Sequence, residues 1–249
     1  MTKIIAIFNQ AGGVAKSTLT FNLGYSLSQL QQKVLLVDID PQASLTTFMG
    51  LEPSELDQTL YHSILHDAPL PIHSIHGLDL VPANIDLSGA ELELVTADLR
   101  DLRLKDALEP VEGKYDYILL DCPPSLGILS YISLVAATHV LVPIQTHYKA
   151  LRGTELLLKT VSRVKKKPNK SLALAGFIPT LYDQRTSQDA LSLQAIKEQL
   201  SPLAPVFDPI PRSIAFADAV QAHLPLALYQ PKHPTISLLN DIAQALLLR

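Results

Sequence analysis

The chain has 249 residues, 47% of them hydrophobic, which is enough for one large core. Its formal net charge of -4 argues against a protein that coats nucleic acid through overall positive charge, but it leaves room for a local basic patch. The single cysteine, Cys122, excludes an internal disulfide framework, and no apolar run reaches the about 18 residues that a membrane span needs, so we expect a cytoplasmic protein.

Short apolar runs rich in β-branched residues alternate with helical patterns along the whole chain. Apolar residues at consecutive positions are typical of strands that are buried on both faces of a parallel sheet. The alternation predicts a single α/β domain over residues 1–249, a doubly wound and mostly parallel sheet with helices on both faces. The runs cover residues 3–8, 33–38, 78–83, 115–121, 139–144 and 172–180.

Two segments between and after these runs carry local signals of their own. Ser88 followed by Glu91 forms a capping-box pattern, which predicts a helix that continues to about Glu109. Residues 201–213 contain four prolines. Because proline is confined to the edges of sheets, this segment predicts a short edge strand between turns.

The segment QAGGVAKST, which follows the first predicted strand, opens a helical pattern. A standard phosphate-binding loop, G-x-x-x-x-G-K-[ST], has glycine where this chain has Gln10 and Ala15, so only Lys16 and Ser17 match it. Two glycines before a helix N-terminus still bring several backbone N–H groups to one point, as polyphosphate binding requires. We expect Lys16 to neutralise the β- and γ-phosphates, Ser17 to bind Mg²⁺ and Thr18 to contact the α-phosphate.

Three aspartates stand at or just beyond the ends of predicted strands. Asp38 and Asp40 follow the second run, and Asp121 ends the fourth. Ligands of open α/β sheets bind in the crevice at the carboxyl ends of the strands, where these residues meet the loop. We expect Asp121 to hold Mg²⁺ through water, Asp40 to orient the attacking water and contribute to the metal site, and Asp38 to take part in catalysis. The simpler alternative, turn-capping aspartates beside a surface lysine, does not account for their convergence.

With these residues in place, the chain closely resembles the ParA/MinD family of deviant Walker-box ATPases over residues 3–248. The segments that carry the resemblance are GGVAKST, VLLVDIDPQAS, YDYILLDCPPSLG, LVPIQTHYKALRG, and LYDQRT followed by PIPRS, in the family's order. The resemblance implies hydrolysis of ATP with Mg²⁺ by a homodimer that holds two nucleotides between its subunits. It also implies that the dimer binds DNA or a membrane and that a partner protein triggers hydrolysis.

Carried over residue by residue, the resemblance assigns a nucleotide site. Ser17 and Asp121 belong to the magnesium group, and Asp40 is the hydrolytic aspartate. Thr180 and Pro211 would lie against the adenine. The phosphate loop would consist of Gly12, Gly13, Val14, Ala15, Lys16, Ser17 and Thr18.

The chain departs from the family pattern at Ala11. The family has K-G-G-x-x-K-[ST], and its first lysine reaches the nucleotide of the partner subunit, much as an arginine finger does. Either hydrolysis is weak here, or another cation replaces that lysine. We take Lys149 as the candidate, and Arg152 failing it, although Lys149 is equally well explained as a surface lysine at a helix start. In lacking this lysine, the chain is also similar to the McdA subgroup, whose members position carboxysomes over the nucleoid.

Residues 149–170 contain eight basic residues against one acid, a local charge of +7 on a net-acidic chain. Such a patch fits DNA binding through phosphates without sequence preference, and a solvated helix end is the simpler alternative. The last helical pattern, TISLLNDIAQALLLR, has too few basic residues to attract anionic lipid, so we expect a core-packed helix and no membrane partner. The DNA-binding candidates are Arg152, Arg163, Lys165, Lys166, Lys167, Lys170 and, further along, Arg185 and Arg212.

The sequence therefore predicts a nucleoid-associated ATPase that dimerises on ATP, binds nonspecific double-stranded DNA and positions or segregates a cargo. Carboxysomes are the favoured cargo, and a small ParB- or McdB-like adaptor is the expected partner that stimulates hydrolysis. A ParA that partitions plasmids or chromosomes is the first alternative. A nucleotide-binding module that has lost hydrolysis is the second, because of Ala11.

Overall fold

The structure is a computed structural model that describes residues 2–147 and 150–248, without the side chains of residues 150–152. The described chain forms one sheet with the strand order β3-β4-β2-β5-β1-β6-β7. All neighbouring strands are parallel except β3, which pairs antiparallel with β4. The strands are β1 (Lys3–Ile7), β2 (Val34–Asp38), β3 (His73–Ile75), β4 (Leu78–Val81), β5 (Tyr117–Asp121), β6 (His139–Gln145) and β7 (Ala173–Thr180).

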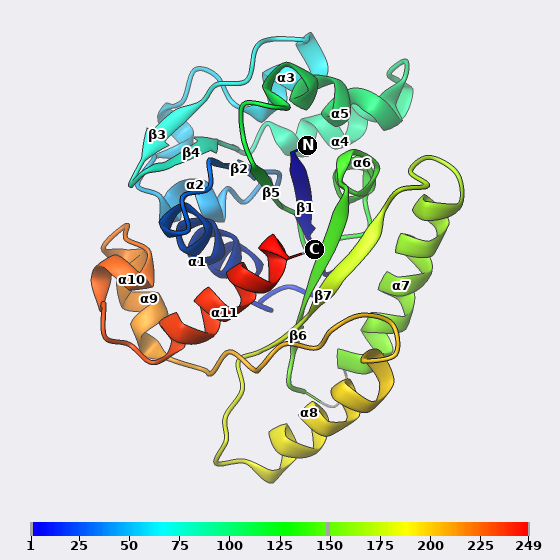
Figure 1. Ribbon diagram of the computed structural model, residues 1–249. Coiled ribbons are helices and arrows are strands. Elements are labelled where there is room, and N and C mark those ends of the chain that lie inside the picture. The colour runs from blue at the N-terminus through cyan, green and yellow to red at the C-terminus, as the bar shows by residue number, and fades with distance from the viewer. Residues whose placement is uncertain (1, 148–149, 249) are drawn as a thin grey trace.

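Helices cover both faces of this sheet, as the alternating pattern predicts (Figure 1). One face packs against α1, α2 and α11, and the other against α3 to α8. The helices are α1 (Lys16–Gln29), α2 (Ser44–Phe48), α3 (Leu60–His66), α4 (Leu87–Thr96), α5 (Arg103–Leu108), α6 (Ile128–Ala136), α7 (Ala150–Lys166), α8 (Ser187–Leu200), α9 (Ile214–Gln221), α10 (Leu226–Tyr229) and α11 (Thr235–Leu247), with the 3-10 turns η1 (Pro53–Glu55), η2 (Arg100–Leu102) and η3 (Glu109–Val111).

The central strands are buried on both sides, which explains their unbroken apolar runs. In β1, Ile4 and Ala6 pack into the core on one face, and Ile5 and Ile7 pack into the core on the other. The prediction of a doubly wound, mostly parallel sheet is therefore confirmed. The sequence did not signal β3, because its three residues are too short for a pattern and only partly buried.

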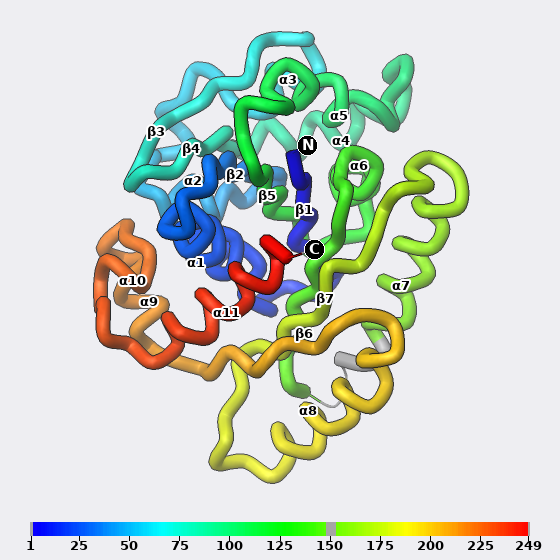
Figure 2. The backbone as a smooth tube through the Cα atoms, viewed as in Figure 1, coloured from blue at the N-terminus to red at the C-terminus, as the bar shows by residue number. Residues whose placement is uncertain are grey.

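The last helix, α11, lies beside α1, as the tube in Figure 2 shows. Lys3 Nζ at the start of β1 donates a hydrogen bond of 2.8 Å to the carbonyl oxygen of Leu246 in α11. This last helix buries Leu239 and Ile242 against α1 and the sheet, so the expectation of a core-packed helix is confirmed. Within residues 2–147 and 150–248, no helix is both long and apolar enough to cross a bilayer.

The helix predicted from Ser88 to Glu109 is wrong in its start and its length. Asp86 occupies the N-cap position of α4, Ser88 lies inside the helix, and the helix ends at Thr96. A single helix of that length would be about 33 Å long, at 1.5 Å per residue, and would project past the strands it covers. The chain instead breaks at Leu99, which has a left-handed backbone with φ of 51°, and α5 then packs on α6.

The edge strand predicted in residues 201–213 is also wrong, because no regular strand forms there. The segment runs along β7 and makes only isolated bridges, from Val206 to Phe177 and from Pro211 to Tyr182. Its prolines remove the N–H donors that a continuous ladder needs. The segment approaches β7 so closely that a Cβ at Gly176 would lie 2.6 Å from the Phe207 ring.

Candidate functional site

The segment after β1 folds into a tight loop that delivers its backbone to the N-terminus of α1. Gly13 and Ala15 both have left-handed backbones, with φ of 69° and 68°. Ala15 is the N-cap of α1, at the position where a standard phosphate loop has glycine. A residue with a Cβ in this conformation costs about 1–2 kcal/mol. Ala15 therefore takes a left-handed backbone at the position where a standard phosphate loop has glycine, in spite of its Cβ.

Lys16, the first residue of α1, is almost completely buried, with 7% of its surface exposed. Its Nζ donates a hydrogen bond of 2.8 Å to the carbonyl oxygen of Ala11, so the side chain folds back over the loop. Burial lowers the pKa of Lys16, and the charges of Asp121 and Asp40 oppose that shift. The lysine thus places a positive charge at the centre of the loop.

Asp121 ends β5 beside Lys16 and is fully buried. Its Oδ1 accepts a hydrogen bond of 3.3 Å from Thr20 Oγ1, while its Oδ2 has no partner among the described residues. Burial, followed by the charge of Asp38, raises the pKa of Asp121 well above its ordinary range, and the nearby Ser17 hydroxyl and the charge of Lys16 oppose the shift. A buried carboxylate oxygen with no partner, next to a serine hydroxyl, fits a site for a hydrated Mg²⁺ held by Ser17 and Asp121.

Asp38 and Asp40 play different parts at the end of β2. Asp38 is fully buried, and its Oδ2 accepts hydrogen bonds of 2.8 Å from both the backbone N–H and the hydroxyl of Thr46. Its Oδ1 accepts a hydrogen bond of 3.2 Å from the backbone N–H of Asp40. The oxygens of Asp38 therefore hold the segment that carries Asp40. Asp40 itself lines an open pocket at the carboxyl edge of the sheet.

The loop and Asp40 line an open pocket of about 400 Å³ at the carboxyl edge of the sheet. Sequence reasoning missed part of its wall, namely Gln42 and Ser44 in DPQAS, Pro124 in DCPP and Phe48 in α2. Val14 is buried under the loop, so its side chain does not line the pocket. The pocket is lined by Gly12, Gly13, Ala15, Lys16, Ser17, Thr18, Asp40, Gln42, Ser44, Phe48 and Pro124.

The two residues expected against the adenine lie in different surroundings. Thr180 at the end of β7 is fully buried, and its hydroxyl donates a hydrogen bond of 3.2 Å to the carbonyl oxygen of Val14. It supports the phosphate loop from beneath and presents no surface to a base. Pro211 lines a second pocket of about 520 Å³, which begins two residues beyond Thr180, at Tyr182. The buried hydroxyl of Thr235 in this pocket has no partner among the described residues.

Cys122, next to Asp121, is a small buried residue and not a nucleophile. It is 1% exposed, and burial raises the pKa of its thiol to about 12. The thiolate that nucleophilic chemistry needs is therefore absent near neutral pH.

Two residues are candidates to replace the missing lysine, Lys149 and Arg152. The structure describes neither Lys149 nor the side chain of Arg152. The backbone nevertheless places the start of α7 at the loop. Gln10 Nε2 donates a hydrogen bond of 3.0 Å to the carbonyl oxygen of Gly153. The first turn of α7 and the exposed Ala11 therefore both lie at the carboxyl edge of the sheet.

The DNA-binding candidates do not form one surface. Arg163, Lys165, Lys166, Lys167 and Lys170 are all exposed at the C-terminal end of α7 and in the turn before β7. Arg185 follows the opposite end of β7, where its guanidinium pairs with Asp183 at 2.7 Å. The eight residues of β7 separate the two groups by about 25 Å, at about 3.3 Å per residue.

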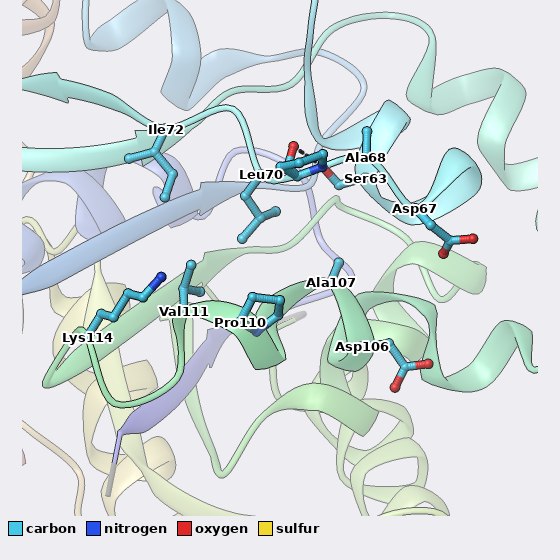
Figure 3. A pocket seen from close by; sticks show the side chains of 11 residues that line it. Ser63, Asp67, Ala68, Leu70, Ile72, Asp106, Ala107, Pro110, Val111 and Lys114 are labelled. Carbon is cyan, nitrogen blue, oxygen red and sulfur yellow. Dashed lines mark hydrogen bonds between the residues drawn. The ribbon is translucent and has the colours of Figure 1, made fainter.

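A further groove of about 430 Å³ lies away from this chemistry, between the end of α3 and η3, near Lys114 before β5 (Figure 3). Figure 3 shows an apolar centre of Leu70, Ile72 and Val111 with acidic side chains at one side. None of the residues that line it belongs to the predicted site.

The comparisons with known proteins agree with this geometry. A family model described as an AAA domain matches residues 2–174. The sporulation initiation inhibitor protein Soj of Bacillus subtilis is 40% identical over 248 residues, and the match covers 98% of both chains. Two solved structures superimpose over nearly the whole chain.

The first is a cobyrinic acid a,c-diamide synthase from Mycobacterium smegmatis with bound ADP and magnesium. It is 37% identical with a TM-score of 0.87, and the match covers 99% of this chain and 94% of that one. The second is a variant of McdA from Cyanothece in complex with ATP, which is 26% identical with a TM-score of 0.89 and coverages of 98% and 96%. The chain therefore belongs to the ParA/MinD family of AAA-domain proteins.

Proposed function

We propose that the chain is a Mg²⁺-dependent ATPase that dimerises on ATP and uses this switch to position or segregate a cargo on DNA. One observation carries the ATPase assignment. The buried Lys16 and the unpartnered Oδ2 of Asp121 lie beside a pocket whose loop has left-handed backbones at Gly13 and Ala15. The nucleotides and magnesium in the titles of related structures support ATP and Mg²⁺ as its cofactors.

In this proposal, each residue of the pocket has a separate task. Lys16 neutralises the β- and γ-phosphates after it releases the carbonyl of Ala11, and the backbone N–H groups of the loop bind phosphate oxygens. Ser17 and Asp121 hold the magnesium ion, which supplies charge neutralisation when bound. Asp40 accepts a hydrogen bond from the attacking water and orients it, and Asp38 keeps Asp40 in place through the segment ending at Thr46.

The exposed loop supports dimerisation across the carboxyl edge. Ala11, Gly12 and Gly13 are exposed, and the pocket beside them is open to solvent. A second subunit placed over this edge would enclose the nucleotide and exclude water. Lys149 remains our candidate for the cation that crosses to the partner's nucleotide, because the backbone of Gly153 already contacts the loop.

Sequence identity to the relatives and the residue at position 11 favour different cargoes. The chromosome partitioning protein ParA of Myxococcus xanthus is 39% identical to the chain, against 26% for McdA, which favours a partition complex as the cargo. The alanine at position 11 favours the carboxysome-positioning subgroup, as described above. We take a partition complex as the first candidate and carboxysomes as the second, with a small adaptor protein as the stimulating partner.

The test is to add ATP and Mg²⁺ to the purified chain and follow its mass by light scattering and its retention on DNA. The wild type should form a dimer that is retained on DNA at low salt. Lys16→Ala should abolish both responses, whereas Lys33→Ala, at an exposed lysine at the other end of the sheet, should leave them unchanged. Asp40→Ala should bind ATP and trap the dimer. A wild type that stays monomeric and unretained would refute the switch.

A second candidate function rests on Ala11. If no other cation crosses the dimer, the chain binds ATP and dimerises but does not hydrolyse it. Measured phosphate release, with DNA and the cognate adaptor present, separates this binding module from the ATPase.

A further inference from the structure

Two side-chain amides stand directly before Ala11 and join the phosphate loop to neighbouring elements. Asn9 is buried, and its Nδ2 donates a hydrogen bond of 2.6 Å to the carbonyl oxygen of Pro143 in β6. Its Oδ1 accepts a hydrogen bond of 2.9 Å from the backbone N–H of Ala11. Gln10 Nε2 donates to the carbonyl oxygen of Gly153, in the first turn of α7. Asn9 thus ties the loop to the sheet, whereas Gln10 ties α7 to the loop.

The contact between Gln10 and Gly153 is close, and it leaves the amide a single orientation. A Cβ at Gly153 would lie 3.3 Å from Gln10 Nε2, so a larger residue would press on the amide. The reverse orientation would set Gln10 Oε1 against the Gly153 carbonyl oxygen, and neither of these atoms carries a proton. As it stands, Oε1 is buried and has no partner among the described residues, which costs free energy. One hydrogen bond therefore holds the amide, and a small displacement of the loop is enough to break it.

The backbone of Ala11, next to Gln10 in the chain, depends on Lys16. The Ala11 carbonyl oxygen accepts the hydrogen bond of 2.8 Å from Lys16 Nζ, and its N–H donates to Asn9 Oδ1. The Ala11 side chain is exposed and adds no buried packing. A phosphate oxygen carries more negative charge than a carbonyl oxygen, so a bound polyphosphate draws the Lys16 ammonium away from Ala11. The residue beside Gln10 then loses one of these two anchors.

The part of α7 that Gln10 contacts can move without the rest of the helix. Among the described side chains of α7, the apolar ones that pack into the core begin at Leu157, one turn after Gly153. Of residues 154–156, only Thr154 is buried. Helix ends also open more readily than helix centres. Loss of the Gln10 contact therefore loosens the first turn while the packed turns that follow stay in place.

We propose that Gln10 is a positioning residue, which holds the first turn of α7 against the phosphate loop in the nucleotide-free chain and releases it when Lys16 moves to a phosphate. The path leads from Lys16 through the Ala11 carbonyl to Gln10 and then to α7, and each step is a hydrogen bond or a neighbour in the chain. The released turn contains Arg152 and directly follows Lys149, the two candidate cations. The nucleotide step rests on the proposed function, whereas the contact between Gln10 and α7 does not.

The contact is tested by hydrogen exchange of the full, nucleotide-free chain, read by mass spectrometry in a fragment that covers residues 154–160, the α7 fragment. Helical amides from residue 154 onward bond to carbonyls of the first turn, so their exchange reports how firmly that turn is held. Gln10→Met keeps the side-chain length but removes the amide, and it should speed this exchange about threefold to tenfold, the effect of one hydrogen bond. Lys16→Met, which frees the Ala11 carbonyl and does not touch α7, should also speed it.

The matched control is Gln32→Met, because Gln32 Nε2 also donates a hydrogen bond of 3.0 Å to a backbone carbonyl, that of Leu30, but stands before the amino end of β2. It should leave the α7 fragment unchanged. The double variant Gln10→Met/Lys16→Met should exchange no faster than Gln10→Met alone, since both changes break one path. Unchanged exchange in Gln10→Met would overturn the inference. An equal rise in the buried strand β5 would also overturn it, because it would show a general loss of stability.

The nucleotide step is tested with ADP and Mg²⁺, since ADP supplies a β-phosphate for Lys16, with scattering to check that the chain stays monomeric. ADP should speed exchange of the α7 fragment in the wild type and add nothing in Gln10→Met. Because ADP must break the contact in the wild type, linkage requires Gln10→Met to bind ADP about threefold to tenfold more tightly by calorimetry, and Gln32→Met to bind it as the wild type does. Equal or weaker binding by Gln10→Met would overturn the inference and leave the proposed function standing. Absence of ADP binding in the wild type would instead refute the proposed function.

Discussion

Ala15 occupies a backbone conformation that glycine adopts without cost, and this makes the loop a source of measurable strain. We expect Ala15→Gly to raise the free energy of unfolding by about 1 kcal/mol, because it removes the clash of the Cβ with its own carbonyl. The melting temperature, measured by circular dichroism without nucleotide, should rise by about 2–4 °C. The control is Ala195→Gly within α8, which should lower stability by about 0.5–1 kcal/mol. Equal losses in both variants would contradict a strained loop.

A second prediction at the residue scale concerns Asp38. Burial raises the pKa of this aspartate to about 7 in spite of the hydrogen bonds from Thr46. The unfolded chain has an aspartate pKa of about 3.9, so between pH 4 and 7 the folded state binds more protons than the unfolded state. This group therefore stabilises the fold at low pH, and its contribution is lost as the pH rises through 7. Asp38→Asn should remove that dependence.

The measurement is urea unfolding of the wild type and Asp38→Asn at pH 5 and pH 7, without nucleotide. The stability of the variant relative to the wild type should increase with pH by on the order of 2 kcal/mol. Comparing the variant with the wild type cancels the contributions of the other carboxylates. One of these is Asp183, whose pKa is lowered by Arg185 to about 2. A relative stability that falls as the pH rises would show that Asp38 is ionised in the fold.

At the scale of elements, the sequence predicts the strands and the turns after them, because their pattern depends on burial and recurs along the chain. Strands buried on both faces have unbroken apolar runs, and the turns after them bring Lys16, Asp40 and Asp121 to one edge by the geometry of parallel sheets alone. The break after α4 was not predictable, because it depends on how α5 packs on α6. The same holds for Thr180, which lies 166 residues from the carbonyl that it supports.

The end of α7 carries the element-scale prediction on DNA. Lys165→Gln/Lys166→Gln/Lys167→Gln should weaken retention of the ATP-bound protein on DNA and make it less dependent on salt. Each phosphate contact contributes about 0.9 to the slope of log affinity against log salt concentration, so the loss should be about 1–3 in slope. Filter binding over a range of salt concentrations measures it.

The matched variant for this cluster is Arg185→Gln, at the other end of β7. It should leave the slope unchanged if DNA contacts the end of α7. The reverse result, in which Arg185→Gln lowers the slope and the triple variant leaves it unchanged, would place DNA at the carboxyl edge. The two groups are too far apart for one contact to involve both, since about 25 Å of β7 separates them.

The whole molecule adds a constraint that neither residues nor elements show alone. The nucleotide pocket opens at the carboxyl ends of the strands, whereas the basic end of α7 stands near their amino ends. In a dimer joined over the two pockets, the basic clusters of the two subunits point away from each other. On the proposed function, each subunit would then contact DNA separately, and dimerisation would strengthen retention by giving two linked contacts instead of one continuous surface.

The proposed dimer also leads to a test of the positive charge that is missing at Ala11. Ala11 is exposed beside the pocket, and the start of α7 contacts the neighbouring Gln10, so a cation from either position can face the opposite subunit. Lys149→Ala should lower ATP turnover by about 10³-fold or more if its charge crosses the dimer as an arginine finger does. Adding Ala11→Lys to Lys149→Ala should restore turnover, because the new lysine supplies the charge at the family's own position. Phosphate release at saturating ATP, with dimer formation checked by scattering, measures both effects. Turnover that is unchanged in Lys149→Ala would remove this lysine from the mechanism, and a failure of Ala11→Lys to rescue would show that the lost function was structural.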